Sequence, residues 1–140
     1  MGMPPKTMEQ LTKVVVAYLD KRRQRGYTYD FSPLRDAFNL LPPEDPLQGR
    51  GEKLYLKDLK ALFFVKDFVG NRDAQDSPNL ESPAHGRPIE VTFSDGETLL
   101  GRTEGFNPQK IGFFMFPADP KSNNLRIFVI IKNARRIRFL

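Results

Sequence analysis

VVVAYLDKRRQRGYTYDFSPLRDAFNLLP, residues 14–42, and IEVTFSDGETLLGRTEGFNPQKIGFFMFP, residues 89–117, align without a gap when Val14 is placed over Ile89. Eight of the 29 aligned positions are identical, including the glycines Gly26 and Gly101. Sequence similarity at a fixed spacing is typical of a duplicated structural unit. The same register returns near the end of the chain, in the pairs Leu62/Ile137 and Phe64/Phe139.

Each copy is built from short segments with the residue pattern of β-strands. Ile89, Val91 and Phe93 alternate with polar residues, which is the period of a half-buried strand. Asp95-Gly96 follows, and this dipeptide between apolar strands predicts a hairpin with a type I′ turn, whose two central residues both have positive φ. No segment shows a sustained 3.6-residue period, so little helix is expected.

The second strand of each copy carries a glycine at the matched position, Gly26 within Arg23–Phe31 and Gly101 within Thr98–Phe106. A glycine inside a strand indicates a bulge or a sharp bend, which would curl a small sheet. Five short strands per copy therefore predict an all-β protein made of two tandem five-stranded SH3-like or Sm-like small barrels. An OB-like barrel is the alternative.

The expected organisation has four parts: an N-terminal tail (1–12), a first barrel repeat (13–67), a linker (68–87) and a second barrel repeat (88–140). The linker is assigned from its turn-forming residues and few apolar ones. Units of about 55 residues are near the lower limit for a self-sufficient core. The two barrels are therefore expected to pack together as a pseudo-symmetric pair.

Several strands are apolar on both faces, which indicates an interface. Val15 and Leu19 lie on the second face of the first strand, and Phe114 and Phe116 lie in the third strand of copy two. A strand that is apolar on both faces is normally buried on both. These four residues are candidate interface residues, either between the two barrels or in a homodimer.

The composition argues against catalysis. The chain has no cysteine, and its single histidine, His85, lies in the predicted linker, so thiol chemistry, histidine-based triads and the usual zinc sites are not expected. No phosphate-binding or dinucleotide-binding motif is found. We expect no enzyme activity, no metal and no cofactor.

No apolar run is long enough for a membrane span or a secretory signal, so the cytoplasm is the expected location.

The formal net charge of +5 favours anionic partners. Arginine beside aromatic rings can pair with phosphates and stack on bases, provided strand alternation places these side chains on one face. Alternatively, the rings enter the core, the arginine stems cover its edge, and the terminal arginines protect an edge strand. The candidate nucleotide-binding or nucleic-acid-binding residues are Arg22, Arg23, Arg25, Tyr27, Tyr29, Arg135, Arg136 and Arg138. On a regular strand, Arg23, Arg25, Tyr27, Tyr29 and Phe31 would share that face.

The hairpin, the strand glycine and the following Phe106-Asn107-Pro108 resemble the first half of a bacterial Sm-like fold. That resemblance implies an RNA-base pocket around Asn107–Gln109 and Lys132–Arg135, although the family's Arg-Gly pair is absent. Asp30–Arg35 resembles the D-x-S-x-x-G motif of PilZ domains, which bind cyclic di-GMP, with arginine in place of the final glycine.

YLKDLKALFFVKDF (55–68) together with GFFMFPADPKSNN (112–124) resembles an uncharacterised bacterial family that occurs alone or beside PilZ-type signalling domains. The resemblance implies a regulatory role by association. The predicted function is therefore a non-enzymatic bacterial cytoplasmic binding or adaptor module that binds a protein and no membrane. An anion-binding module for RNA or a cyclic dinucleotide is the alternative.

Overall fold

The computed structural model describes residues 5–69, 86–119 and 121–140. All regular elements there are β-strands or short 3₁₀ turns, which confirms the all-β prediction. None of the described helical turns could cross a membrane. The first half contains η1 (Met8–Gln10), β1 (Thr12–Tyr18), β2 (Arg23–Thr28), β3 (Ala37–Leu40), β4 (Glu52–Tyr55), η2 (Leu56–Asp58) and β5 (Leu59–Val65). The second half contains β6 (Arg87–Phe93), β7 (Thr98–Thr103), β8 (Gly112–Pro117), β9 (Asn124–Ile130), η3 (Ile131–Asn133) and β10 (Ala134–Phe139).

The strands are antiparallel and follow the sequence repeat. Eight of them form one sheet in the order β10-β6-β7-β8-β9-β5-β1-β2, and β3 pairs with β4 in a separate two-stranded sheet. A single bridge between Tyr27 and Leu41 connects β2 to the end of β3. In each half the last strand lies beside the first, and a 3₁₀ turn precedes that last strand. The register that aligns the two copies of the sequence also aligns η2 with η3.

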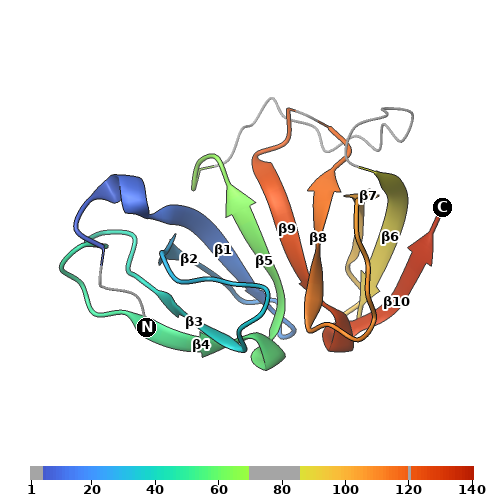
Figure 1. Cartoon of the computed structure of the whole chain (residues 1–140), viewed down its shortest axis with the longest axis horizontal. Coiled ribbons are helices and arrows are strands. Elements are labelled where there is room, and N and C mark those ends of the chain that lie inside the picture. The colour runs from blue at the N-terminus through green and yellow to red at the C-terminus, as the bar shows by residue number, and fades with distance from the viewer. Residues whose placement is uncertain (1–4, 70–85, 120) are drawn as a thin grey trace.

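The two halves are joined by the pairing of β5 with β9, which lie side by side in the middle of the molecule (Figure 1). Leu62 is opposite Phe128 and Phe63 is opposite Ile127 in this register. All seven residues of β5 are buried. A strand with a neighbour on each edge and a packed core on each face has no access to water, which explains its nearly continuous apolar sequence.

Two hydrophobic cores lie on opposite faces of the β5–β9 pair, and each contains residues from both halves. Alternate residues of these two strands point into alternate cores, as the two-residue side-chain period requires. The first core consists of Val14, Val16, Phe38, Leu40, Leu54, Leu56, Leu59, Leu62, Phe64, Phe128 and Ile130. The second core consists of Ala17, Ala61, Phe63, Val65, Ile89, Val91, Phe93, Phe113, Met115, Ile127 and Val129.

The four candidate interface residues are half-buried. Val15 packs against the second core and Phe114 against the first, so both contribute to packing within the chain. Leu19 lies in the turn after β1, and Phe116 lies on β8 opposite Arg102. The strand with the greatest burial is β5, which the sequence pattern did not single out.

The predicted hairpin after β6 is present, but the type I′ prediction is wrong. The Gly96 N–H donates to the Phe93 carbonyl, and the Phe93 N–H donates to the Glu97 carbonyl, which defines a three-residue loop. Within Asp95-Gly96, Gly96 has a φ of 94° and Asp95 does not have a positive φ. This pattern is that of a turn closed by one left-handed residue. In the first half Lys21 takes the equivalent place, with a φ of 72°.

The strand glycines are required for close packing against the neighbouring backbone and not for the predicted bend. Neither Gly26 nor Gly101 has a positive φ, and β2 and β7 end at Thr28 and Thr103, before the predicted Phe31 and Phe106. A Cβ atom on Gly26 would lie 2.5 Å from the Leu41 carbonyl oxygen, and one on Gly101 would collide with the Phe116 carbonyl oxygen. The glycines permit close approach of the next strand's backbone.

Candidate functional site

Two hairpin loops of the same construction meet at the junction of the halves. In the β1–β2 loop the Asp20 carboxylate accepts a hydrogen bond from the Arg22 N–H at 3.0 Å. In the β6–β7 loop the Asp95 carboxylate accepts one from the Glu97 N–H, also at 3.0 Å. Such bonds from an aspartate to the backbone two residues later stabilise a turn. Asp20 and Asp95 occupy equivalent positions of the repeat, but their remaining oxygen atoms bind different cations.

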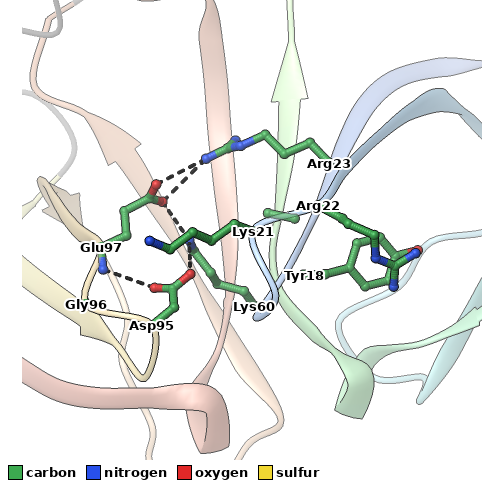
Figure 2. Close-up of a pocket in the computed structure, with 9 residues that line it drawn as sticks. Tyr18, Lys21, Arg22, Arg23, Lys60, Asp95, Gly96 and Glu97 are labelled. Carbon is green, nitrogen blue, oxygen red and sulfur yellow. Dashed lines mark hydrogen bonds and ion pairs between the residues drawn. The ribbon is translucent and has the colours of Figure 1, made fainter.

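Lys60 on β5 extends into this junction and is the most buried charged group there. Its side chain is 3% exposed and that of Asp95 is 6% exposed. The Lys60 Nζ lies 2.8 Å from the Asp95 Oδ2 and 3.0 Å from the Glu97 Oε1 (Figure 2). It also lies 5.1 Å from the centre of the Phe93 ring. A lysine of the first half is therefore neutralised by two carboxylates of the second.

Arg23 extends the same network to the surface. Its guanidinium lies 3.3 Å from the Glu97 carboxylate and 4.9 Å from the centre of the Phe63 ring. Glu97 thus accepts from both Lys60 and Arg23 (Figure 2). Since removal of a buried charge leaves its partner uncompensated, loss of Lys60 or Asp95 alone is expected to destabilise the contact between the halves.

The ion-pair network changes the pKa of the Asp95 carboxyl. Burial raises the pKa of the Asp95 carboxyl, but the hydrogen bonds from the Lys60 ammonium and the Glu97 N–H, together with the charge of Lys60, outweigh burial. The net pKa of Asp95 is lowered from its ordinary value of 3.8. Asp95 is therefore held in its charged form, as the paired ammonium group requires.

A cavity of about 370 Å³ lies over the network, and we call it the junction cavity. Arg22 at its rim binds Asp20 at 2.7 Å and stacks on the Tyr18 ring at 4.4 Å. Most of its cations already have carboxylate or aromatic partners, so the cavity offers few unpaired charges to a ligand. Its lining residues are Ala17, Tyr18, Lys21, Arg22, Arg23, Lys60, Asp95, Gly96 and Glu97.

The structure separates the residues of the predicted nucleotide site. Arg25 is exposed and lines a second cavity of about 440 Å³ with Arg23, Arg50 and two prolines; we call this the β2 cavity. Tyr27 contacts Phe68 edge to face, and Tyr29 lines a different cavity.

The expectation of one shared face is wrong beyond Tyr27. The strand ends at Thr28, and Phe31 packs against the first core. The regular alternation that would have kept Tyr29 and Phe31 beside Arg25 therefore stops with the strand.

The second basic group lies at the other end of the sheet. Arg135, Arg136 and Arg138 are on β10, whereas Arg22, Arg23 and Arg25 are on or beside β2, and these two strands are the opposite edges of the eight-stranded sheet. Figure 1 shows the two strands on opposite sides of the molecule. Arg138 pairs with Glu90 at 3.0 Å. One ligand of ordinary size would not contact both groups.

A further cavity, of about 670 Å³, lies on the outer side of the β3–β4 sheet, and we call it the β3–β4 hollow. It contains two prominently exposed apolar side chains, Leu34 at 76% and Ile111 at 38%. Ala37, Asn39 and Lys53 line it from the two strands, and Asp30, Arg35, Asp36 and Phe38 complete it. Exposed apolar groups rimmed by polar ones are typical of protein contact surfaces.

Sequence reasoning missed Lys60 and the hollow. A single charge inside the apolar run LKALFFV was the available signal for a buried ion pair, since charges are rarely buried unless paired. The hollow had no such signal, because Leu34 and Ile111 belong to different copies of the repeat and lie far apart in the chain. In the ranges 5–69, 86–119 and 121–140 no His, Cys, Asp and Glu side chains gather into a metal-binding group. His85 lies outside the described residues.

The fold and the junction define an all-β protein whose two halves share one sheet and a buried ion-pair network. The chain belongs to DUF6982, a family of unknown function whose model matches residues 10–140. No curated protein and no solved structure matches the chain. Membership in an uncharacterised family is thereby confirmed, and the likeness to Sm-like and PilZ domains stays a prediction.

Proposed function

We propose that this protein is a non-enzymatic adaptor of the bacterial cytoplasm that binds another protein at the β3–β4 hollow. We also propose that each half is a small SH3-like or Sm-like barrel and that the two form a pseudo-symmetric pair. The strand order within each half and the 3₁₀ turn before the last strand support this interpretation. The functional proposal rests on one observation: the hollow lies on a face of the first half whose equivalent in the second half is buried.

The hollow is the counterpart of an interface that already exists within the chain. In the register that places Val14 over Ile89, Asn39, Lys53 and Tyr55 of the first half correspond to Phe114, Phe128 and Ile130 of the second. Phe128 and Ile130 are buried in the first core and Phe114 packs against it, so the first half covers this face of the second. The same face of the first half borders the open hollow.

The residues at the hollow suit a partner that is not permanently bound. Polar Asn39 and Lys53 stand where the second half has phenylalanine, and Tyr55 is 42% exposed. Transient interfaces combine a small apolar centre with a polar rim, and Leu34 and Ile111 supply the centre here. A protein surface with an apolar anchor and charges complementary to Arg35, Asp36 and Lys53 would fit.

Site-specific photo-crosslinking tests this proposal. A photoreactive amino acid at position 34 is expected to give a discrete adduct in cells, whereas the same group at position 125, another exposed leucine, is not. The protein identified in the adduct is then purified and titrated, and Leu34→Glu should weaken its binding about tenfold or more, as expected for a central interface residue. Equal adducts at positions 34 and 125, or equal affinity of the wild type and Leu34→Glu for the purified protein, would contradict the proposal.

The alternative function is binding of a phosphate-containing ligand, and one observation favours it. Arg23, Arg25 and Arg50 line the β2 cavity together, and Arg25 and Arg50 are exposed. Guanidinium groups that converge on a cavity can hold a phosphate by paired hydrogen bonds. Glu44 and Glu52 line the same cavity and oppose an anion, which is why this function takes second place.

Titration with a short single-stranded RNA and with cyclic di-GMP tests the alternative. If the β2 cavity binds either ligand, Arg25→Glu with Arg50→Glu should abolish binding, and affinity for the RNA should fall steeply with salt. Lys57→Glu with Lys121→Glu gives the same change of net charge away from the β2 cavity and should bind like the wild type. Absence of binding to both ligands at low salt would exclude this function.

A further inference from the structure

The outer edge of β10 is equivalent, in the repeat, to the edge of β5 that pairs with β9. In the first half the last strand, β5, pairs with β1 on one side and with β9 on the other. In the second half the last strand, β10, pairs with β6 and is the end of the sheet. The chain itself therefore shows that the last strand of this repeat can accept an antiparallel strand along its second edge.

The backbone of β10 presents hydrogen-bonding groups to that edge. The Leu140 N–H donates to the Pro88 carbonyl, so Leu140 directs its backbone groups toward β6. Since these directions alternate along a strand, Ile137 and Phe139 direct their N–H and C=O groups to the outer edge. Two residues of this kind provide up to four hydrogen bonds for an added strand.

The side chains of β10 differ from those of β5, so a strand that pairs with the outer edge of β10 must differ from β9. Ala61, Phe63 and Val65 of β5 point into the second core, and in the register of the repeat they correspond to Arg136, Arg138 and Leu140. Ile137 and Phe139 keep an apolar face against the second core. Arg135 and Arg136 are exposed and make no ion pair with the residues that the structure describes. A strand lying along this edge would therefore meet arginine on one face and apolar residues on the other.

A second copy of this chain that paired through β4 does not satisfy these requirements. The edge that could pair with β10 as β9 pairs with β5 is that of β4. In that arrangement Arg136 and Arg138 would enter the first core of the neighbouring copy, and Lys53 of that copy would occupy the place of Phe128. Burial of these three cations costs more than the strand pairing would recover.

We propose that the outer edge of β10 binds an extended segment of a partner protein in which acidic and apolar residues alternate. The acidic side chains would lie on the face of Arg136 and Arg138, the apolar ones on the face of Ile137 and Phe139, and the backbone would extend the sheet. Addition of a strand to an exposed edge is a general mode of peptide recognition, in which alternate side chains give specificity. This site is separate from the β3–β4 hollow, and its test does not depend on the proposed function.

The probe is a fluorescein-labelled peptide, Gly-Ser-Glu-Val-Glu-Val-Glu-Gly-Ser, whose binding is followed by fluorescence anisotropy. A peptide of the same composition, Gly-Ser-Glu-Glu-Glu-Val-Val-Gly-Ser, is the control for simple charge attraction. The wild type should bind the alternating peptide about tenfold more tightly than the control, and Arg136→Glu should remove that difference. Lys121→Glu makes the same charge change in the segment before β9 and should bind both peptides like the wild type.

Amide hydrogen exchange gives the readout that charge attraction alone would not change. Saturation with the alternating peptide should slow exchange at Ile137 and Phe139, whose N–H groups face the outer edge. Leu140, which already donates to Pro88, should change little. Equal affinity for the two peptides, or unchanged exchange at Ile137 and Phe139, would overturn the proposal. Leu34→Glu should leave this binding intact, so failure here and failure at the hollow are distinguishable.

Discussion

Replacement of Gly101 with alanine is expected to destabilise the protein by about 3 kcal/mol, at the upper end of the usual cost of inserting a carbon atom into a packed site. Gly101 pairs with Ile89 on one side and with Pro117 on the other. Its added Cβ would collide with the carbonyl oxygen of Phe116, which belongs to the backbone and cannot rotate away as a side chain could. The whole β7–β8 pair must move to admit it. Urea unfolding at constant slope measures the change.

Gly105→Ala is the matched control, because it adds the same atom where no other atom lies within 4 Å. Gly105 also lacks a positive φ, so alanine introduces no backbone strain there. Its effect is expected to stay within about 0.5 kcal/mol of zero, as for ordinary surface substitutions. Equal stability of Gly101→Ala and Gly105→Ala would show that the strands can separate freely at Gly101.

Lys60→Met is expected to cost about 3–5 kcal/mol, the range found when one partner of a buried ion pair is removed. Methionine keeps most of the length of the side chain, so the loss comes from the charge. Asp95 would then be a nearly buried carboxylate without its ammonium partner. Adding Asp95→Asn should recover part of the loss, because asparagine can still accept the hydrogen bond from Glu97 N–H that closes the turn. Thermal and urea unfolding of both variants test this.

The same pair predicts a dependence on pH. In the wild type the pKa of Asp95 is below its unfolded value of 3.8, so its contribution to stability is complete above about pH 4 and is lost as the pH falls through the folded pKa. In Lys60→Met only the Glu97 N–H and the charge of Lys21 still oppose burial, so the pKa of Asp95 should rise relative to the wild type and protonation relieves the buried charge. The stability difference between wild type and variant should therefore narrow on acidification from pH 7. A difference that stays constant with pH would show that Asp95 and Lys60 are not coupled.

The amino-acid sequence by itself determined the repeat, the all-β class and the approximate position of every strand. These follow from local chemistry, since alternation at Ile89–Phe93 and the turn residues Asp95-Gly96 act over a few residues. The turn type was wrong because the Asp95 carboxylate accepts the Glu97 N–H and closes a three-residue loop, as Asp20 does in the first half, and Asp95 keeps a φ that is not positive. The sequence correctly identified the strand glycines as important, but it predicted a bend at them. Their actual role is close packing, and the crowding by Phe116 exists only when the strands are paired.

The tertiary structure alone decided what each position of the repeat does. Lys60 and Arg135 are equivalent in the sequence, yet Lys60 is buried in an ion pair and Arg135 is exposed. The difference arises because β9 and the second core cover β5, whereas β10 ends the sheet. A sequence repeat specifies two similar units, but their packing against each other is necessarily unequal at the outer edges. Burial, and with it the choice between a core position and a binding surface, depends on which edge a neighbour covers.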